Sequence, residues 1–88
     1  MHANTMKIDV KLFALLGKYL PEGTKGNEAE FDVEDGVSVT DVLAALEVPP
    51  EQCHLVLVNG IYLASSERDG RTLTEGDALA VWPPVAGG

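Results

Sequence analysis

Apolar and polar residues alternate along two early stretches of the chain, residues 6–12 and residues 28–33. A period of two is typical of a strand with one buried face. Residues 14–20, between the two stretches, are predicted to form a short helical turn that Pro21 ends. Two strands joined by a connection of this length most simply form an antiparallel pair.

The apolar period changes after this pair and predicts one amphipathic helix. Ser38 is a good N-cap, and Asp41 completes a capping box with the shorter acid. Pro49-Pro50 prevents the helix from continuing. A helix of two to three turns with one apolar stripe must lie against a sheet. The stripe consists of Val39, Val42, Leu43 and Leu46.

Three further strands are predicted in the second half of the chain. The continuous apolar run at residues 54–58 is typical of a central strand covered on much of both faces. Asn59-Gly60 is a strong hairpin signal, so residues 61–63 form a short return strand at an edge. Residues 78–82 form the last strand, which Pro83-Pro84 must end because proline cannot donate to a ladder.

This order of elements predicts an α+β fold, with a mixed sheet of four to five strands and one main helix across one face. It is the β-grasp, or ubiquitin-like, arrangement if the first and last strands lie parallel at the centre, a pairing that periodicity does not reveal. We expect a loose extension over residues 1–5, one domain over residues 6–82 and an extended tail over residues 83–88.

Composition narrows the classes of partner. The 88 residues include 14 acidic and 6 basic side chains, a net charge of −8. This charge disfavours nucleic acid and anionic membranes and favours a basic protein surface, unless it serves only solubility. A single cysteine, Cys53, forms no internal disulfide, and the sequence contains neither a secretory pattern nor an apolar run of membrane-spanning length. We therefore expect a soluble, cytoplasmic protein.

Ordinary catalytic and metal-binding motifs are absent from the sequence. Cys53 and His54 are adjacent, but neighbours in an extended segment point to opposite faces and cannot form a nucleophile–base pair. Two such residues without a third ligand also make a weak metal site. We therefore predict no metal site and no bound cofactor.

The C-terminal tail has an unusual composition. Pro83 and Pro84 favour an extended path away from the domain, and six residues reach roughly 20 Å at about 3.3 Å each. Val85 and Ala86 are small, and Gly87 and Gly88 have no Cβ, so a narrow channel can close around their backbone. The tail therefore suits delivery of a carboxylate into a partner's active site, although a frayed terminus is the alternative.

The ending resembles that of the MoaD/ThiS sulfur carriers, and most closely the type that forms the small subunit of molybdopterin synthase. The resemblance covers residues 6–88 and rests on Leu73-x-x-Gly76-Asp77-x-Leu79-x-Val81-x-Pro83-Pro84-Val85-Ala86-Gly87-Gly88. It implies a β-grasp carrier that is not an enzyme by itself. Residues 7–20, the helix at residues 38–46 and the Val58-Asn59-Gly60 hairpin follow the family's order.

The resemblance also implies a chemistry and a set of partners. A ubiquitin-activating-type adenylyltransferase would use ATP to adenylate the carboxylate of Gly88. A sulfur donor protein would then convert it to a thiocarboxylate. The sulfur acceptor would be the large subunit of molybdopterin synthase. Pro83 and Pro84 would direct the tail toward this subunit, and Gly87 would let the tail turn and enter it.

Several alternatives stay open. Carriers for thiamine, cysteine or tungsten-cofactor synthesis have similar endings, a ubiquitin-like protein modifier shares the activation step, and a plain binding module would not use the tail. If Leu79 and Val81 pack on the helix, alternation places Trp82 on the open sheet face just before the tail. An aromatic side chain there suits partner docking, and the alternative is that it only covers the end of the sheet. Tyr62 and Leu63 are lesser docking candidates.

Overall fold

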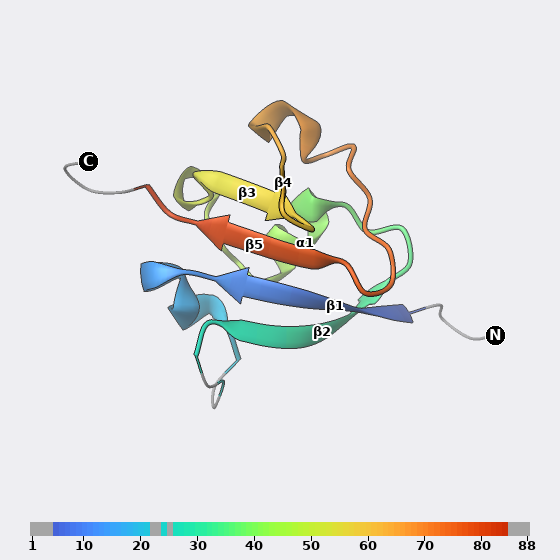
Figure 1. The fold of residues 1–88 in the computed structure, drawn as a ribbon, viewed down its shortest axis with the longest axis horizontal. Helices are drawn as coiled ribbons and strands as arrows, with labels where there is room; N and C mark the ends of the chain where they lie inside the picture. The colour runs from blue at the N-terminus through green and yellow to red at the C-terminus, as the bar shows by residue number, and fades with distance from the viewer. Residues whose placement is uncertain (1–4, 22–23, 25, 85–88) are drawn as a thin grey trace.

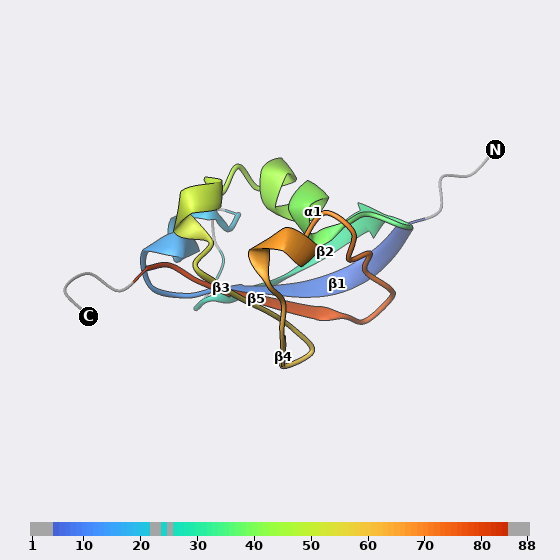
Figure 2. The ribbon, with the colours of Figure 1, turned by 90° about the horizontal axis from the view of Figure 1, so that it is seen from above.

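Five strands form one mixed sheet in the computed structural model, which describes residues 5–21, 24 and 26–84. The strands are β1 (Thr5–Leu12), β2 (Glu28–Glu34), β3 (Leu55–Val58), β4 (Ile61–Tyr62) and β5 (Ala78–Trp82). One α-helix, α1 (Val39–Ala45), lies across one face of this sheet (Figures 1 and 2). Three short 3₁₀-helices lie in the connections: η1 (Ala14–Tyr19), η2 (Pro50–Gln52) and η3 (Ser65–Glu67).

The strand order is β2-β1-β5-β3-β4, so the first and last strands are neighbours in the middle of the sheet. They are parallel, with Leu12 opposite Val81, while β5 pairs antiparallel with β3 on its other side. This confirms the β-grasp architecture. The helical segments lie on one side of the sheet (Figure 2), and the other side is called the open face below.

Strands β1 and β2 form the predicted antiparallel pair, with Ile8 opposite Phe31. β1 begins at Thr5, one residue earlier than the pattern indicated. Every second side chain of β1 from Met6 to Leu12 is buried, while the alternate ones face the open side. The alternation read from the sequence therefore decided which face of this strand packs under the helix.

Helix α1 begins and ends where the local chemistry requires. Ser38 Oγ accepts a hydrogen bond from Asp41 N–H at 3.0 Å, and Asp41 Oδ2 accepts one from Ser38 N–H at 3.1 Å, which confirms the capping box. Glu47, directly after the C-cap, has φ of 64°, a left-handed conformation that ends a helix. Val39, Val42 and Leu43 are buried toward the sheet.

Strand β3 is not the central strand that the apolar run indicated. It lies second from the edge, between β5 and the two-residue strand β4. Val56 and Val58 are buried under the helical layer, whereas Leu55 and Leu57 on the open face are half-buried. The run is continuous because the open face is apolar here and not because a second layer covers it. Edge strand β4 confirms the predicted return strand.

Hydrogen bonds join the turn of the β3–β4 hairpin to the start of β5. Asn59 and Gly60 have φ of 52° and 83°, the left-handed pair that a type I′ turn needs. Asn59 Nδ2 donates to Asp77 Oδ1 at 2.8 Å, and Asn59 Oδ1 accepts from Ala78 N–H at 2.9 Å. Thr74 N–H donates to Asp77 Oδ2 at 2.9 Å. These bonds fix where β5 begins.

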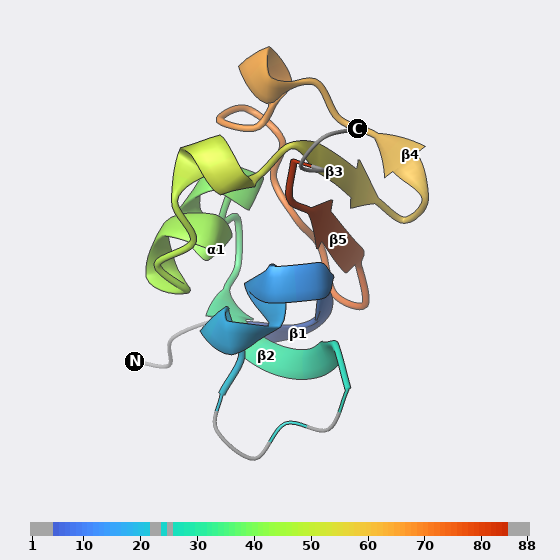
Figure 3. The same cartoon turned by 90° about the vertical axis from the view of Figure 1, so that its left-hand side faces the viewer.

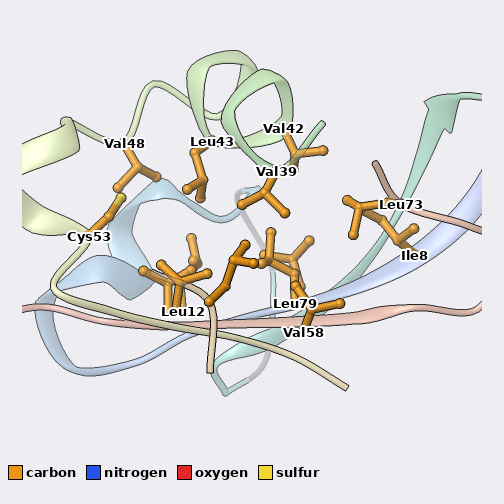
Figure 4. Packing of buried hydrophobic residues seen from close by; sticks show 14 of the residues in the cluster. Ile8, Leu12, Val39, Val42, Leu43, Val48, Cys53, Val58, Leu73 and Leu79 are labelled. Carbon is orange, nitrogen blue, oxygen red and sulfur yellow. The ribbon is translucent and has the colours of Figure 1, made fainter. Parts of the chain in front are cut away.

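The core lies between the inner face of the sheet and the helical layer (Figure 4). The three middle strands contribute four side chains that are each 0% exposed: Leu12, Val56, Leu79 and Val81. Val39 and Leu43 of α1 pack down onto them from above (Figure 4). This small, closed core leaves the ends of the sheet and the open face to carry function.

Candidate functional site

The end of β5 is held by backbone hydrogen bonds on both sides. Phe13 N–H donates to the carbonyl oxygen of Val81 at 3.1 Å, and His54 N–H donates to that of Trp82 at 3.0 Å. Phe13 directly follows β1 and His54 directly precedes β3, and these two strands are the neighbours of β5 in the sheet. The position of the last strand is therefore set up to Trp82, the residue before the tail.

Trp82 is also fixed through its side chain. Its ring stacks on that of Phe13, with 4.3 Å between ring centroids and an interplanar angle of 7°. Phe13 reaches this position because Leu12 is in parallel register with Val81, so the residue after β1 lies beside the last residue of β5. Ala14 then takes a left-handed conformation, with φ of 54°, and the chain turns into η1 at this end of the sheet (Figures 1 and 3).

Phe13 is a site residue that the sequence reasoning missed. In the sequence it marks only the place where strand alternation breaks. Its role depends on the parallel pairing of β1 with β5, which no local pattern reveals. Had the pairing been known, the alignment of Leu12 with Val81 would have placed Phe13 next to Trp82.

Pro83 and Pro84 follow this stack. Pro83 is half-buried and Pro84 is exposed, so the chain leaves the sheet over these two residues. The remaining tail positions predicted as functional, Val85, Ala86, Gly87 and Gly88, lie outside the described residues. Their assignment rests on the sequence and on the place from which the tail starts.

Half of the open face is apolar. Leu55 lies opposite Trp82, and Leu57 lies opposite both Ala80 and Tyr62, which puts these side chains on one face. Tyr62 is 60% exposed. Two of the predicted docking residues, Trp82 and Tyr62, therefore share a surface, which we call the apolar strip. It comprises Leu55, Leu57, Tyr62, Ala78, Ala80 and Trp82.

Leu63, the third predicted docking residue, does not belong to this surface. It is 8% exposed and part of the core. Its backbone N–H donates to the carbonyl oxygen of Val56 at 2.9 Å, which holds the chain after β4 against β3. An exposed apolar residue on the same hairpin, Ile61, pairs with Val58 and so belongs to the other face.

The edge of the open face formed by β2 is acidic. The alternate positions of β2 carry exposed carboxylates, and only Asp32 has a salt-bridge partner within the described part of the chain, Lys7 Nζ at 2.9 Å. The hydrogen bond to Asp32 raises the pKa of Lys7. Because this pair is exposed, it adds little to stability. The acidic row, as we call it, comprises Glu28, Glu30, Asp32 and Glu34.

Cys53 and His54 do not form a reactive pair. Cys53 is 5% exposed, and burial raises the pKa of its thiol against the opposing effect of the Arg68 charge. His54 is exposed. The residues that the structure describes contain no group of three or more His, Cys, Asp or Glu side chains placed to hold a metal ion. None of their helices is long and apolar enough to cross a membrane.

A β-grasp domain with one helix, whose central last strand continues directly into a C-terminal tail, defines the class of ubiquitin-like carriers and modifiers. The ThiS family model matches residues 10–88 of this chain. The chain therefore belongs to the ThiS family, and it is a MoaD/ThiS-type carrier by fold and by sequence. No curated protein sequence matches it.

Solved structures agree with this placement. The solution structure of the Haloferax volcanii HVO 2177 protein is 30% identical, with a TM-score of 0.75 over 97% of this chain and 89% of that one. SAMP1 from Haloferax volcanii is 27% identical, with a TM-score of 0.64 over 93% and 99% of the two chains. A putative molybdopterin converting factor, subunit 1, from Pyrococcus furiosus is 26% identical, with a TM-score of 0.66 over 91% and 99%.

Proposed function

We propose that this protein is a sulfur carrier whose Gly88 carboxylate is adenylated and then converted to a thiocarboxylate, for use in molybdopterin synthesis. The observation that carries the proposal is the firmly held end of β5, from which a Pro-Pro-Val-Ala-Gly-Gly tail starts. A rigid base and a tail poor in side chains are what a carboxylate needs to enter another protein's active site. Membership in the ThiS family supports this use.

The chemistry requires two steps because a carboxylate is a poor electrophile. In the first, an oxygen of the Gly88 carboxylate attacks the α-phosphorus of ATP on an adenylyltransferase, and pyrophosphate leaves. In the second, a sulfide sulfur supplied by a donor attacks the acyl carbon, the C–O bond to AMP breaks, and AMP leaves with the bonding electrons. The product is a thiocarboxylate, an ionised sulfur nucleophile that an acceptor enzyme can use.

The tail residues divide the mechanical work. Pro83 and Pro84 restrict φ and direct the chain outward from Trp82. Val85 and Ala86 keep the tail narrow, and Gly87 lets a channel wall approach the backbone. The carrier itself supplies no general acid or base in this scheme. Its partners supply the catalytic groups, and this chain supplies a positioned carboxylate.

The open face is the surface that we assign to the activating enzyme and to the acceptor. Its apolar strip ends at Trp82, so a partner seated on it lies next to the start of the tail. The acidic row, which lies across β1 from the strip, favours a partner with a basic rim, because complementary charge speeds encounter and fixes orientation. Docking and tail insertion would then be coupled by geometry.

Molybdopterin is the pathway that we favour, with the large subunit of molybdopterin synthase as the acceptor. The double proline before Val-Ala-Gly-Gly supports it, as does the likeness to the converting-factor subunit from Pyrococcus furiosus. Carriers for thiamine, cysteine or tungsten-cofactor synthesis are the alternatives. Activation is common to all of them, so the acceptor decides among them.

Intact mass spectrometry tests the activation step. The purified chain is incubated with its cognate adenylyltransferase, ATP and sulfide, and we expect a mass increase equal to the exchange of one oxygen for sulfur. A chain lacking Gly87 and Gly88 is the control, since it should keep its fold and gain no sulfur. No mass change with a proven cognate enzyme would refute the proposal. Sulfur transfer to a pterin precursor by the large subunit then tests the pathway.

A second function, covalent modification of other proteins, is favoured by the likeness to SAMP1 from Haloferax volcanii and to the small archaeal modifier protein 1 from Methanosarcina acetivorans. The activated Gly88 carboxyl would then form an isopeptide bond with a lysine. Peptide mapping of cell extracts should detect Gly88-linked lysines if this function operates. A plain binding module would keep its partner and phenotype after removal of Gly87 and Gly88, whereas a carrier or modifier would lose its function.

A further inference from the structure

Strand β2 forms the edge of the sheet that has room for another strand. The strand order leaves its outer side without a neighbouring strand within the described part of the chain (Figure 1). β2 has seven residues, whereas β4 at the opposite edge has only two. A long edge strand presents a row of backbone donors and acceptors with which another chain can pair. We call the outer side of residues 28–33 the β2 edge.

The register of β1 with β2 shows which backbone groups point outward. Hydrogen-bonded and non-hydrogen-bonded pairs alternate along an antiparallel ladder. Leu12 N–H donates to the carbonyl oxygen of Asn27 at 2.8 Å, so Asp9 and Glu30, three positions further along, form a non-hydrogen-bonded pair. Asp9 N–H agrees with this, because it donates at 3.0 Å to the carbonyl oxygen of Asp77 on the other side of β1.

The outward backbone groups belong to acidic residues. Glu28, Glu30 and Asp32 direct their N–H and C=O groups away from β1, where no group of the described residues bonds to them. Their exposed carboxylates lie on the open face. Phe31 and Val33 alternate with them, face the helical side and are half-buried at the border of the core. The β2 edge therefore combines free hydrogen-bonding groups, negative charge on one face and apolar surface on the other.

The charge of this edge selects the chain that can pair with it. Two copies of β2 do not fit together, because antiparallel pairing through their outward groups would set carboxylates opposite carboxylates. A strand with Lys or Arg opposite Glu28, Glu30 and Asp32 would form cross-strand pairs of opposite charge instead. Its intervening side chains would lie on the helical side, where aliphatic groups would cover Phe31 and Val33.

We propose that the β2 edge binds an extended segment of a partner protein in which Lys or Arg alternates with aliphatic residues, added to the sheet as an antiparallel strand. The segment pairs through its backbone, and its side chains supply the selectivity. β1 separates this edge from β5, so the bound segment leaves Trp82 and the apolar strip accessible. The proposal does not rest on the sulfur-carrier function, because strand addition uses no group of the tail.

Synthetic peptides test the site on the full chain. Acetyl-Lys-Val-Lys-Val-Lys-Val-Lys-amide has the required alternation, and acetyl-Lys-Lys-Lys-Lys-Val-Val-Val-amide has the same composition and charge without it. In a titration followed by NMR, we expect a dissociation constant on the order of 0.1 mM for the alternating peptide and about tenfold weaker binding of the block peptide. Equal affinities, or no saturable binding of the alternating peptide, would overturn the proposal.

Amide hydrogen exchange distinguishes strand addition from electrostatic attraction. Saturating alternating peptide should slow exchange at Glu30 and Asp32, whose N–H groups point outward, several-fold. The Phe31 N–H points toward β1 and should change little. Binding without added protection at Glu30 and Asp32 would show that the peptide is attracted to the carboxylates only, which contradicts the proposal.

Methylated peptides identify the bonded side of the added strand. In the antiparallel arrangement, lysine N–H groups of the peptide face β2 and valine N–H groups face away. N-methylation of the two middle lysines should therefore abolish binding, whereas N-methylation of two valines should weaken it by no more than about threefold. Equal affinities of the two methylated peptides, or the reverse order, would overturn the antiparallel assignment.

A pair of variants at one position separates the backbone from the charge. Glu30→Pro removes an outward N–H and no bond to β1, a change that edge strands tolerate. Glu30→Thr also removes the carboxylate but keeps the N–H and a side chain that suits strands. We expect Glu30→Pro to abolish binding and Glu30→Thr to weaken it about threefold, with thermal unfolding as the check on the fold. Equal binding by two folded variants would contradict pairing at this edge.

Discussion

Phe13 and Trp82 lie face to face, 4.3 Å apart between ring centroids, at the end of the sheet where the chain passes into Pro83. Phe13 follows the first strand and Trp82 completes the last, so the stack joins the C-terminal ends of β1 and β5. It extends the parallel pairing of β1 with β5 by one aromatic contact. The base of the tail is thereby held by side chains as well as by the backbone.

The stack should contribute measurably to stability. Phe13→Leu and Trp82→Leu, alone and together, form a double-mutant cycle, and we expect a coupling free energy of about 0.5–1.5 kcal/mol from urea unfolding. Phe13→Leu combined with Tyr62→Leu is the matched control and should be additive, because Tyr62 is outside the stack. A coupling near zero between Phe13 and Trp82 would show that the stack does not stabilise the fold.

The β3–β4 hairpin offers a clean test of the apolar strip. Tyr62→Ser should change the unfolding free energy by less than about 1 kcal/mol because the side chain is 60% exposed, yet weaken binding to the activating enzyme several-fold. Ile61→Ser removes a neighbouring side chain that is 72% exposed but belongs to the other face. Calorimetric titration should separate them. Equal losses in both variants would argue against docking on the open face.

Asp77 should make stability depend on pH. Burial raises the pKa of its carboxyl, but hydrogen bonds from Asn59 and Thr74 and the charge of Arg71 outweigh burial, and the pKa is lowered overall. A folded-state pKa below the unfolded value, about 3.9, gives stability that is present above that value and lost as pH falls through the folded pKa.

Asp77→Asn removes this contribution. The difference in unfolding free energy between the natural chain and the variant should be largest near neutral pH and shrink below about pH 4. Urea titrations at a series of pH values measure it. Comparing the two chains cancels the titration of the other carboxylates. A difference that stays constant down to pH 2 would mean that Asp77 acts through packing and not through its charge.

The acidic row should govern the rate of encounter with the activating enzyme. Glu28→Lys combined with Glu30→Lys reverses two charges of the row and leaves the Lys7–Asp32 pair intact. We expect a lower association rate constant and a weaker dependence on salt in stopped-flow measurements. Glu47→Lys with Glu51→Lys makes the same change in net charge at exposed positions away from β2. If both pairs slow association equally, net charge alone is responsible.

Local features of this protein were determined by the sequence alone. The alternation in residues 6–12 predicted β1, Ser38 and Asp41 predicted the cap of α1, and Asn59-Gly60 predicted the hairpin turn, all of which the structure confirms. Each of these signals depends on residues within a few positions of one another. The Gly-Gly tail was also evident, because its composition needs no partner to be recognised.

Only the tertiary structure decided which distant segments meet. The position of β3 beside the edge, the stack of Phe13 on Trp82 and the placement of Arg68 over Cys53 depend on pairings across long stretches of chain. An apolar run reads the same whether a helix, a strand or a partner protein covers it, so its burial on one face could not be predicted. These contacts are set by packing of the whole core, which a local hydrophobic period or a helix cap does not predict.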